Sequence, residues 1–585
     1  MSGSESYYVG VDVGSGSARA CLINGAGDIL SIAVKDIKTW KTKDIHEQSA
    51  DDIWGACCSV TRQVIEESKV LASTVKGIGF DATCSLVVLD RQTDAPISVS
   101  GPKFDESERN IILWADHRAL DQANRINATE HNLLKYVGET MSLEMEIPKI
   151  LWLKENMPTE TFKKCKFYDL PDFLTYRATG DEARSFCSTV CKMSFVPPGV
   201  DDSKDGWQAD FFESIGLGEF VENDYVQIGG IPDKNGRWLS AGEVVGGLSD
   251  KAAAELGLEK GTKVGSAVID AYAGWIGTAG AKLNGSDAKE AQQEGAQSIE
   301  AASNRLAAVA GTSTCHLVCS KDPVFVPGVW GPYKDALIPD FWLAEGGQSA
   351  TGSLLHHITH NHKAFPEAEA KAKGLGIPVF EYLNRRLEEL RVEDNAPTIA
   401  HMARQLFMYP DFHGNRSPLA DPTMRGTIIG LGMDADIDSL ALQYHAAMEA
   451  IGLQTRHIID SMNARGHKID SIYMSGGQCK NPVLMHLIAS CTGLPVIKPH
   501  YIDAAVVLGA AMLGMKAATG KDASLWSIMG ECSKAGTAVF PTKSNTEKDI
   551  FEIKYGIFLS MADQQRRFRA LVDRAAEGGE MSRDI

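Results

Sequence analysis

Residues 10–19 have the sequence Gly10-Val-Asp-Val-Gly-Ser-Gly-Ser-Ala-Arg19, and this stretch decides the fold class. An apolar, β-prone segment, residues 7–13, delivers the carboxylate of Asp12 beside a turn of glycine and serine. Such turns direct successive backbone N–H groups into a concavity that binds phosphate, and the serine hydroxyls add donors. The stretch therefore predicts a phosphate-binding β-hairpin. A hairpin turn whose aspartate is bonded internally would have the same pattern.

Strands and helices alternate on the C-terminal side of this hairpin. Residues 29–34 extend it by a strand, a helix begins after Ser49, and residues 75–80 form a buried strand that ends at Asp81. This alternation predicts an α/β architecture.

Two further glycine-containing turns occur in the second half of the chain. Residues 306–310 run into Gly311-Thr312-Ser313-Thr314, which repeats the first hairpin and indicates an internal duplication. We expect the two hairpins to clasp a triphosphate. Gly476-Gly477 follows a strand and precedes a helix that begins near Asn481. Glycines let backbone approach a flat ligand, and a helix N-terminus favours acceptor groups.

The length and the charge of the chain limit what it can be. It has 585 residues, more than one hydrophobic core supports, so two large domains are expected. A polar stretch at 282–303 suggests domains at 1–281 and 282–585, although its own role and that of the C-terminal tail stay open. The formal net charge of −18 argues against nucleic acid and anionic membranes as partners.

Other features point to the cytoplasm. Residues 1–6 are polar and do not resemble a signal peptide, and the longest apolar stretch, 504–515, is too short to span a bilayer. The 12 cysteines are scattered, which is typical of small buried side chains in a reducing compartment. The oligomeric state stays open, with a homodimer as one alternative.

The two hairpins and the Gly-Gly turn, in this order, resemble the two-lobed fold of actin, hexokinase and the Hsp70 chaperones. This ribonuclease H-like fold has duplicated mixed sheets with flanking helices. Finer matches resemble the FGGY carbohydrate kinases. Residues 149–156 are similar to the first family signature, with Glu146 where a small residue or proline is usual. Residues 411–422 are similar to the family's Gly-Glu-Arg-Ser/Thr-Pro run, with Asn415 in place of the glutamate.

The resemblance covers residues 7–514 and is greatest to a D-ribulokinase-like branch, at 81–87, 114–118 and 326–333. It implies an ATP-dependent kinase that uses Mg²⁺. Asp270 ends a strand where the family's general base lies, although the heptapeptide alone is better explained by a helix-capping aspartate. Asp12 and Asp270 are the implied metal ligands.

The resemblance also implies the binding residues. The expected sugar contacts are Thr83, Trp114, Asp116, His117, Lys192, Asp270 and Glu345. The expected nucleotide contacts are Asp12, Gly14, Ser15, Ser17, Arg19, Gly311, Thr312, Ser313, Gly476, Gly477 and Asn481.

The expected reaction is phosphorylation of a pentulose by ATP, with D-ribulose giving D-ribulose 5-phosphate. Two alternatives stay open. One is a kinase for L-ribulose, D-xylulose or ribitol, because exchanging one hydroxyl partner changes specificity without altering a motif. The other is a non-catalytic nucleotide-binding protein of the same fold, such as a chaperone, whose ATP turnover would not respond to sugar.

Overall fold

The computed structural model describes residues 5–291, 298–520 and 523–577, and the chain divides into two compact units. Each unit is assembled from separated stretches of sequence. Unit 1 comprises Met1–Ala307, Leu317–Glu345 and Pro499–Gly536, and unit 2 comprises Ala308–His316, Gly346–Lys498 and Thr537–Ile585. Part of the polar stretch at 282–303, residues 292–297, lies outside the described residues.

A mixed sheet of seven strands forms the centre of unit 1. The predicted N-terminal hairpin is confirmed, because β1 and β2 pair antiparallel and β3 extends them. On its other side β1 runs parallel to β6. The strand order is β12-β13-β6-β1-β2-β3, and β14 also pairs with β6. The strands are β1 (Tyr7–Val13), β2 (Ser17–Asn24), β3 (Ile29–Asp36), β6 (Val75–Ala82), β12 (Val244–Gly247), β13 (Lys263–Gly265) and β14 (Val268–Ile269).

Helices and a second sheet complete unit 1. Ser49 caps α1 through a hydrogen bond from the Asp52 N–H to its side chain, as the sequence predicted. The relevant helices are α1 (Ala50–Ser68), α6 (Phe186–Lys192), α10 (Asp270–Ala279) and α18 (Ala505–Thr519). The second sheet has the order β4-β5-β8-β7-β9, with β4 (Thr39–Lys41), β5 (His46–Gln48), β7 (Leu86–Asp90), β8 (Ile111–Ile112) and β9 (Cys165–Asp169).

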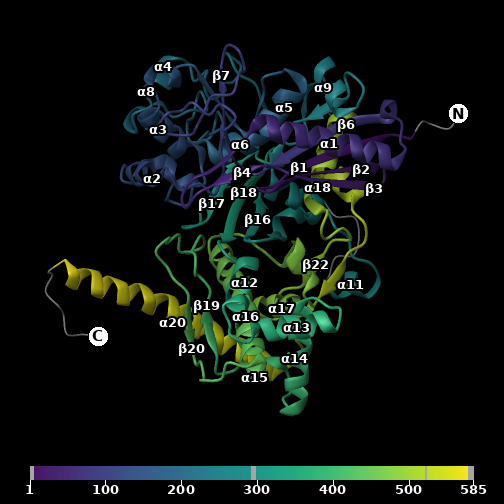
Figure 1. The fold of residues 1–585 in the computed structure, drawn as a ribbon, viewed down its shortest axis with the longest axis vertical. Helices are drawn as coiled ribbons and strands as arrows, with labels where there is room; N and C mark the ends of the chain where they lie inside the picture. Colours follow the sequence, from purple (N-terminus) through teal and green to yellow (C-terminus); the bar gives the residue numbers. More distant parts are fainter. Residues whose placement is uncertain (1–4, 292–297, 521–522, 578–585) are drawn as a thin grey trace. The chain divides into compact units, whose positions relative to one another are not determined.

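Helix α18 lies directly on the backbone of the central sheet (Figure 1). A Cβ atom added to Gly10 on β1 would lie 2.2 Å from the carbonyl oxygen of Val507. One added to Gly79 on β6 would lie 2.0 Å from the carbonyl oxygen of Ala510. Because Gly10 and Gly79 have no side chains, residues 505–519 can pack directly against the strands of unit 1.

Unit 2 contains the second predicted hairpin. The ends of β15 (Arg305–Ala310) and β16 (Thr314–Ser320) that flank the Gly-Thr-Ser turn belong to this unit. The strand order here is β16-β15-β21-β22-β23, in which β21 and β22 are parallel and β22 and β23 are antiparallel. The remaining strands are β21 (Ser471–Ser475), β22 (Val496–Lys498) and β23 (Thr537–Val539), and the main helices are α16 (Ile437–Asn463), α17 (Pro482–Thr492) and α20 (Asn545–Ala576).

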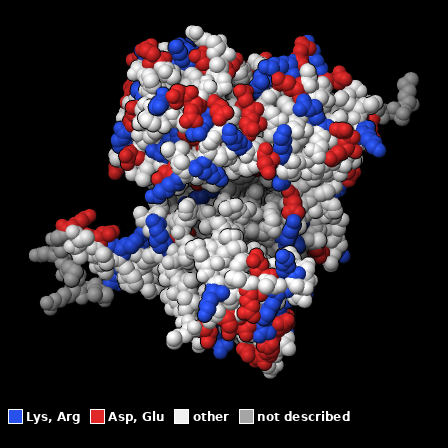
Figure 2. Space-filling model, in the orientation of Figure 1, with Lys and Arg blue, Asp and Glu red and all other residues white. Residues whose placement is uncertain are grey.

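Charged side chains of both signs are interspersed on the visible surface (Figure 2). On α14 (Val379–Glu393) they form ion pairs one helical turn apart, such as Arg385–Glu381 and Arg391–Glu388. Within the described parts of the chain, none of the helices combines the length and the apolar character needed to cross a bilayer.

The close approach of α18 gives a stability prediction. Gly79→Ala should destabilise the protein by about 1–3 kcal/mol, because the new methyl group overlaps the α18 backbone and forces the helix outward. Thermal and urea unfolding would measure the change. Gly55→Ala on α1 is the matched control, since an added Cβ there meets no atom within 4 Å. In a helix interior that substitution should stabilise by about 0.5–1 kcal/mol. Equal effects of the two substitutions would contradict the packing argument.

Candidate active site

Three carboxylates meet at one edge of the central sheet of unit 1. Asp12 lies near the end of β1, Asp81 near the end of β6, and Asp270 directly after β14. The parallel register places Asp12 beside Asp81, and Val268 beside Asp81 on the other side. Because parallel strands end at the same edge, the three side chains gather there. Asp12 and Asp270 were predicted from the sequence but Asp81 was not, although Asp81 ends a predicted strand in the same way.

Burial and mutual repulsion raise the pKa values of these three carboxyl groups. Burial, followed by the nearby Asp12 charge, raises the pKa of Asp270 from 3.8 to about 7, against the opposing effects of the Ala271 N–H and Lys192. Burial and the charges of Asp12 and Asp270 raise the pKa of Asp81 well above its ordinary value. Burial also raises the pKa of Asp12, and Arg19 opposes that rise. A carboxylate that titrates near neutral pH is suited to accept a proton in catalysis.

The turn of the first hairpin is fixed by hydrogen bonds. The Gly14 N–H donates to the carbonyl oxygen of Ser17 at 3.0 Å and closes the turn. The side chain of Trp114 donates from Nε1 to Ser15 Oγ at 2.8 Å. Arg19, opposite Asp12 in the β1–β2 register, donates to the carbonyl oxygen of Asp503 at 2.9 Å. A predicted sugar contact, Trp114, and a predicted nucleotide contact, Ser15, therefore touch each other.

A buried polar cluster brings together two more predicted sugar residues. Glu345 lies on β18 (Trp342–Gln348), and Lys192 ends α6. Lys192 Nζ is 3.4 Å from Glu345 Oε2, and the two side chains are only 2% and 3% exposed. Tyr272, which the sequence analysis did not select, donates from its hydroxyl to the same Oε2 atom at 2.7 Å. Lys192 also contributes to the pKa of Asp270, so this cluster acts on the candidate base.

Thr83 lies just beyond β6 and is buried. Its backbone N–H donates to the carbonyl oxygen of Val13 at 2.9 Å, and its hydroxyl is 3.3 Å from that of Ser85. These contacts place Thr83 at the edge where Asp12 and Asp81 meet, which is compatible with its expected sugar contact.

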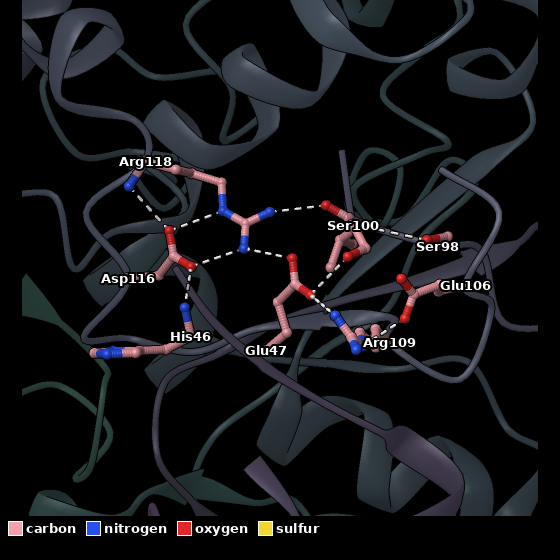
Figure 3. Close-up of polar contacts among 9 residues, drawn as sticks. His46, Glu47, Ser98, Ser100, Glu106, Arg109, Asp116 and Arg118 are labelled. Atoms are coloured by element: carbon pink, nitrogen blue, oxygen red, sulfur yellow. Dashed lines mark hydrogen bonds and ion pairs between the residues drawn. The ribbon is translucent and has the colours of Figure 1, made fainter. Parts of the chain in front are cut away.

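Asp116 is engaged within the protein rather than directed to a ligand (Figure 3). One carboxylate oxygen accepts from the backbone N–H and the Nε of Arg118, at 3.0 and 2.8 Å. The other accepts from Arg118 Nη2 at 2.8 Å and from the His46 N–H at 2.7 Å. All four acceptor positions of the carboxylate are thus used. The expected sugar contact of Asp116 remains a prediction, and this geometry argues for a structural role instead.

The same network includes Glu47 of β5 (Figure 3). Glu47 Oε1 accepts from Arg118 Nη2 at 2.8 Å, and Oε2 accepts from the Ser100 hydroxyl at 3.0 Å. His117, in contrast, has an exposed side chain, and its backbone N–H donates to the carbonyl oxygen of Asp44. The buried ion network therefore anchors the segment that carries Trp114.

The other predicted nucleotide residues lie in unit 2. The Gly311 N–H donates to the carbonyl oxygen of Ser313 at 2.9 Å and closes the turn. The Thr312 carbonyl oxygen accepts from the Thr351 N–H at 3.1 Å. Gln478 donates from Nε2 to the Gly311 carbonyl oxygen at 2.6 Å. Gln478 therefore joins the second hairpin to the Gly-Gly turn, and the sequence analysis missed it.

The Gly-Gly turn requires glycine at its first position. Gly476 has a φ of +96°, and a Cβ there would lie 2.2 Å from the carbonyl oxygen of Ala310. At Gly477 an added Cβ meets no atom within 4 Å, so this side of the turn is open to a ligand. Asn481 caps α17 by accepting from the N–H groups of Val483 and Leu484, at 3.1 and 3.3 Å. Its side chain thus holds the loop in place.

The described residues do not include three His, Cys, Asp or Glu side chains arranged to hold a metal ion by themselves. Mg²⁺ that is bound to nucleotide phosphates needs only one or two carboxylates, the remaining ligands being phosphate oxygens and water. The oxygen-only donors at the strand edge, Asp12 and Asp270, fit that requirement.

Comparison with known proteins assigns the chain to a family. The N-terminal domain model of the FGGY family of carbohydrate kinases matches residues 7–277, and the C-terminal domain model matches residues 306–518. The chain therefore belongs to the FGGY family and is a carbohydrate kinase, and the resemblance found in the sequence is confirmed. The predicted division between residues 281 and 282 falls between the two matched ranges.

Relatives of the chain are also similar over most of its length. It is 52% identical over 513 residues to a D-ribulokinase of Saccharomyces cerevisiae, covering 87% of this chain and 72% of that protein. It is 44% identical over 573 residues to a human FGGY carbohydrate kinase domain-containing protein, covering 97% and 98% of the two chains.

Solved structures confirm the predicted two-lobed α/β fold. A xylulose kinase from Rhodospirillum rubrum matches with a TM-score of 0.72 and 18% identity, covering 96% of this chain and 99% of that one. A glycerol kinase from Plasmodium falciparum, solved with ADP, matches with a TM-score of 0.71 and 15% identity, covering 97% and 99%.

The buried network of Arg118, Asp116 and Glu47 gives a prediction about stability. Arg118→Met should destabilise the protein by about 3–5 kcal/mol, because it removes the buried guanidinium group that pairs with the carboxylates of both Asp116 and Glu47. Arg125→Met is the control, since Arg125 pairs with Glu155 but its side chain is 58% exposed. An exposed pair contributes about 0–1 kcal/mol. Urea unfolding of both variants checks this, and similar losses would refute the structural role of the network.

Proposed function

We propose that this kinase phosphorylates D-ribulose at its terminal hydroxyl, with ATP as the phosphoryl donor and Asp270 as the general base. One observation carries the assignment of the base. Asp270 stands at a strand end with a pKa of about 7, beside the buried Lys192–Glu345 pair. The similarity to a D-ribulokinase supports the choice of sugar.

The proposed reaction is an in-line displacement. Asp270 accepts the proton of the sugar hydroxyl while its oxygen attacks the γ-phosphorus of ATP. The bond between the γ-phosphorus and the bridging oxygen of ADP then breaks, and the products are D-ribulose 5-phosphate, ADP and a proton held on Asp270 until it passes to solvent. A carboxylate oxygen of Asp270 is the group that accepts this proton in the proposal.

Sugar recognition in this proposal depends on the charged pair. Lys192 supplies N–H donors for the carbonyl or a hydroxyl oxygen of the ketose, and Glu345 accepts from a hydroxyl. Trp114 is half-buried and offers an apolar ring for the carbon face of the sugar. Donors and acceptors that are buried with the wrong isomer stay unpaired, which costs about 1–3 kcal/mol each.

The nucleotide is expected to bind through backbone groups rather than through a general positive field. In unit 2 the Gly311–Ser313 turn lies against the Gly476–Gly477 turn, and in unit 1 the turn that contains Ser15 lies beside Asp12. We infer that Asp12 and Asp270 hold a Mg²⁺ ion that neutralises phosphate charge.

The cysteines bear on the compartment in which we expect the enzyme to act. All 12 cysteines are free thiols, and 11 of them are buried, which suits a reducing cytoplasm. The small-molecule partners are the sugar and ATP, and the alternative of a homodimer remains to be measured.

Asp270→Asn tests the base. The amide keeps the shape of the carboxylate but cannot take the proton, so kcat should fall about 10²–10⁴-fold with little change in the KM for ATP. Coupled detection of ADP measures both. Asp172→Asn is a matched control, because Asp172 is also buried with its pKa raised to about 7 but accepts from the backbone of Ser185. Asp270 is not the base if its variant retains near-normal kcat.

A sugar panel tests the substrate. With ATP and Mg²⁺, kcat/KM for D-ribulose should exceed that for L-ribulose, D-xylulose, ribitol and glycerol by at least about tenfold, because one mispaired buried group has that effect. Turnover without sugar should be low. If kcat/KM for another sugar of the panel exceeds that for D-ribulose about tenfold, the assignment of D-ribulose as substrate is wrong. The assignment of the chain as a carbohydrate kinase would stand.

A further inference from the structure

The side chain of Trp114 bridges two predicted parts of the site in unit 1. Its Nε1–H donates to Ser15 Oγ at 2.8 Å, and the two residues are 99 positions apart in the sequence. Trp114 is one of the expected sugar contacts, whereas Ser15 belongs to the turn that is expected to bind phosphate. A single side chain therefore joins the proposed sugar site to the proposed phosphate turn.

The chemistry of the two groups fixes the direction of this hydrogen bond. An indole N–H is a donor only, so the hydroxyl oxygen of Ser15 is the acceptor. A hydroxyl group that accepts in this way still has its own proton to donate. Phosphate, the ligand expected at this turn, offers acceptor oxygens. Trp114 thus orients Ser15 as a donor towards a phosphate of the nucleotide.

The backbone of Ser15 is held by two neighbouring strands. Its carbonyl oxygen accepts from Gln48 Nε2 on β5 at 3.0 Å and from Thr39 Oγ1 on β4 at 3.4 Å. Gln48, which is completely buried, also donates from Nε2 to Thr39 Oγ1 at 3.0 Å. These bonds fix the main chain of the turn, so the contact with Trp114 governs the orientation of the Ser15 side chain.

The neighbour of Gln48 on the same strand, Glu47, fixes the segment that carries Trp114 (Figure 3). Glu47 Oε1 accepts from Arg118 Nη2 at 2.8 Å, and the same Nη2 donates to Asp116 at 2.8 Å. Strand β5 therefore holds the phosphate turn through Gln48 and the Trp114 segment through Glu47. The bond from Trp114 to the turn closes this ring of contacts.

The indole ring of Trp114 is only half-buried. A partly exposed side chain keeps conformational freedom, which a ligand that packs on its ring removes. Once a sugar has ordered the indole, the nucleotide binds to a turn whose Ser15 hydroxyl is already oriented. A second ligand that meets a protein already ordered by the first binds more tightly. The contact therefore provides a route for cooperative binding of the two substrates.

We propose that Trp114 couples the two substrates, because its ring packs on the sugar while its N–H positions the Ser15 hydroxyl for a phosphate of ATP. The inference rests on the proposed function, in which Trp114 contacts the sugar. It goes further in making the affinity for the nucleotide depend on whether the sugar is bound. By thermodynamic linkage, each substrate strengthens the binding of the other by the same factor.

The experiment compares Trp114→Phe with the wild type in the full-length protein. Phenylalanine keeps an aromatic ring for the sugar but has no N–H for Ser15. Calorimetry measures the Kd of a non-hydrolysable ATP analogue with Mg²⁺, in the absence and in the presence of saturating D-ribulose. D-ribulose should lower this Kd at least about fivefold in the wild type and less than about twofold in the variant. The Kd of D-ribulose without nucleotide should change less than about threefold, because the ring is kept.

Trp54→Phe is the matched control. Trp54 on α1 also donates from Nε1 to a side chain, that of Glu255, at 2.7 Å. Neither residue is among the predicted binding residues, so D-ribulose should still strengthen nucleotide binding in this variant. Thermal unfolding of each variant shows whether it is folded. Full coupling in Trp114→Phe, or an equal loss of coupling in Trp54→Phe, would overturn the inference.

A double-mutant cycle tests whether the coupling passes through this one hydrogen bond. Ser15→Ala removes the acceptor and should reduce the coupling as Trp114→Phe does. In the Ser15→Ala background, Trp114→Phe should reduce it little further, since both substitutions remove the same contact. Additive losses would contradict a role of the Trp114–Ser15 bond.

The outcomes distinguish this inference from the proposed function. If the sugar panel favours another sugar, the assignment of D-ribulose fails, and the calorimetry is then made with the favoured sugar. If D-ribulose is the substrate but does not change the affinity of the wild type for the nucleotide analogue, only the coupling role of Trp114 fails.

Discussion

Helix α18 approaches two strands and a second helix so closely that only glycine fits at the points of contact. Gly10 and Gly79 let the helix pack against the backbone of β1 and β6. An added Cβ at Gly277 of α10 would lie 1.9 Å from the carbonyl oxygen of Ala505. The strands carry Asp12 and Asp81, and α10 begins at Asp270. The relative positions of the three carboxylates therefore depend on this backbone-to-backbone packing, which side chains could not provide with the same rigidity.

The gathered carboxylates make the stability of the fold depend on pH. A carboxyl group whose pKa rises from 3.8 to about 7 on folding, as for Asp270, stabilises the folded state below pH 4 and loses that contribution as the pH rises towards 7. The contribution of Asp270 to stability therefore decreases between about pH 4 and pH 7.

Two buried pairs, each of a basic and an acidic side chain, lie in unit 1. Arg118 saturates Asp116 and anchors the Trp114 segment, so that pair is structural. Lys192 Nζ and Glu345 Oε2 lie 3.4 Å apart, and both side chains are almost completely buried.

The sequence by itself determined the features that depend on neighbouring residues. The strand-turn-strand hairpins, the Gly476 turn, the capping Asn481 and the strand-end positions of Asp12 and Asp270 all follow from local pattern, because turns, caps and strand ends are encoded within a few residues. Only the tertiary structure decided that Asp81 lies beside Asp12, that Arg118 and the His46 N–H saturate Asp116, that Tyr272 donates to Glu345, and that α18 belongs to unit 1. These depend on strand register and on contacts between distant segments, which no local pattern records.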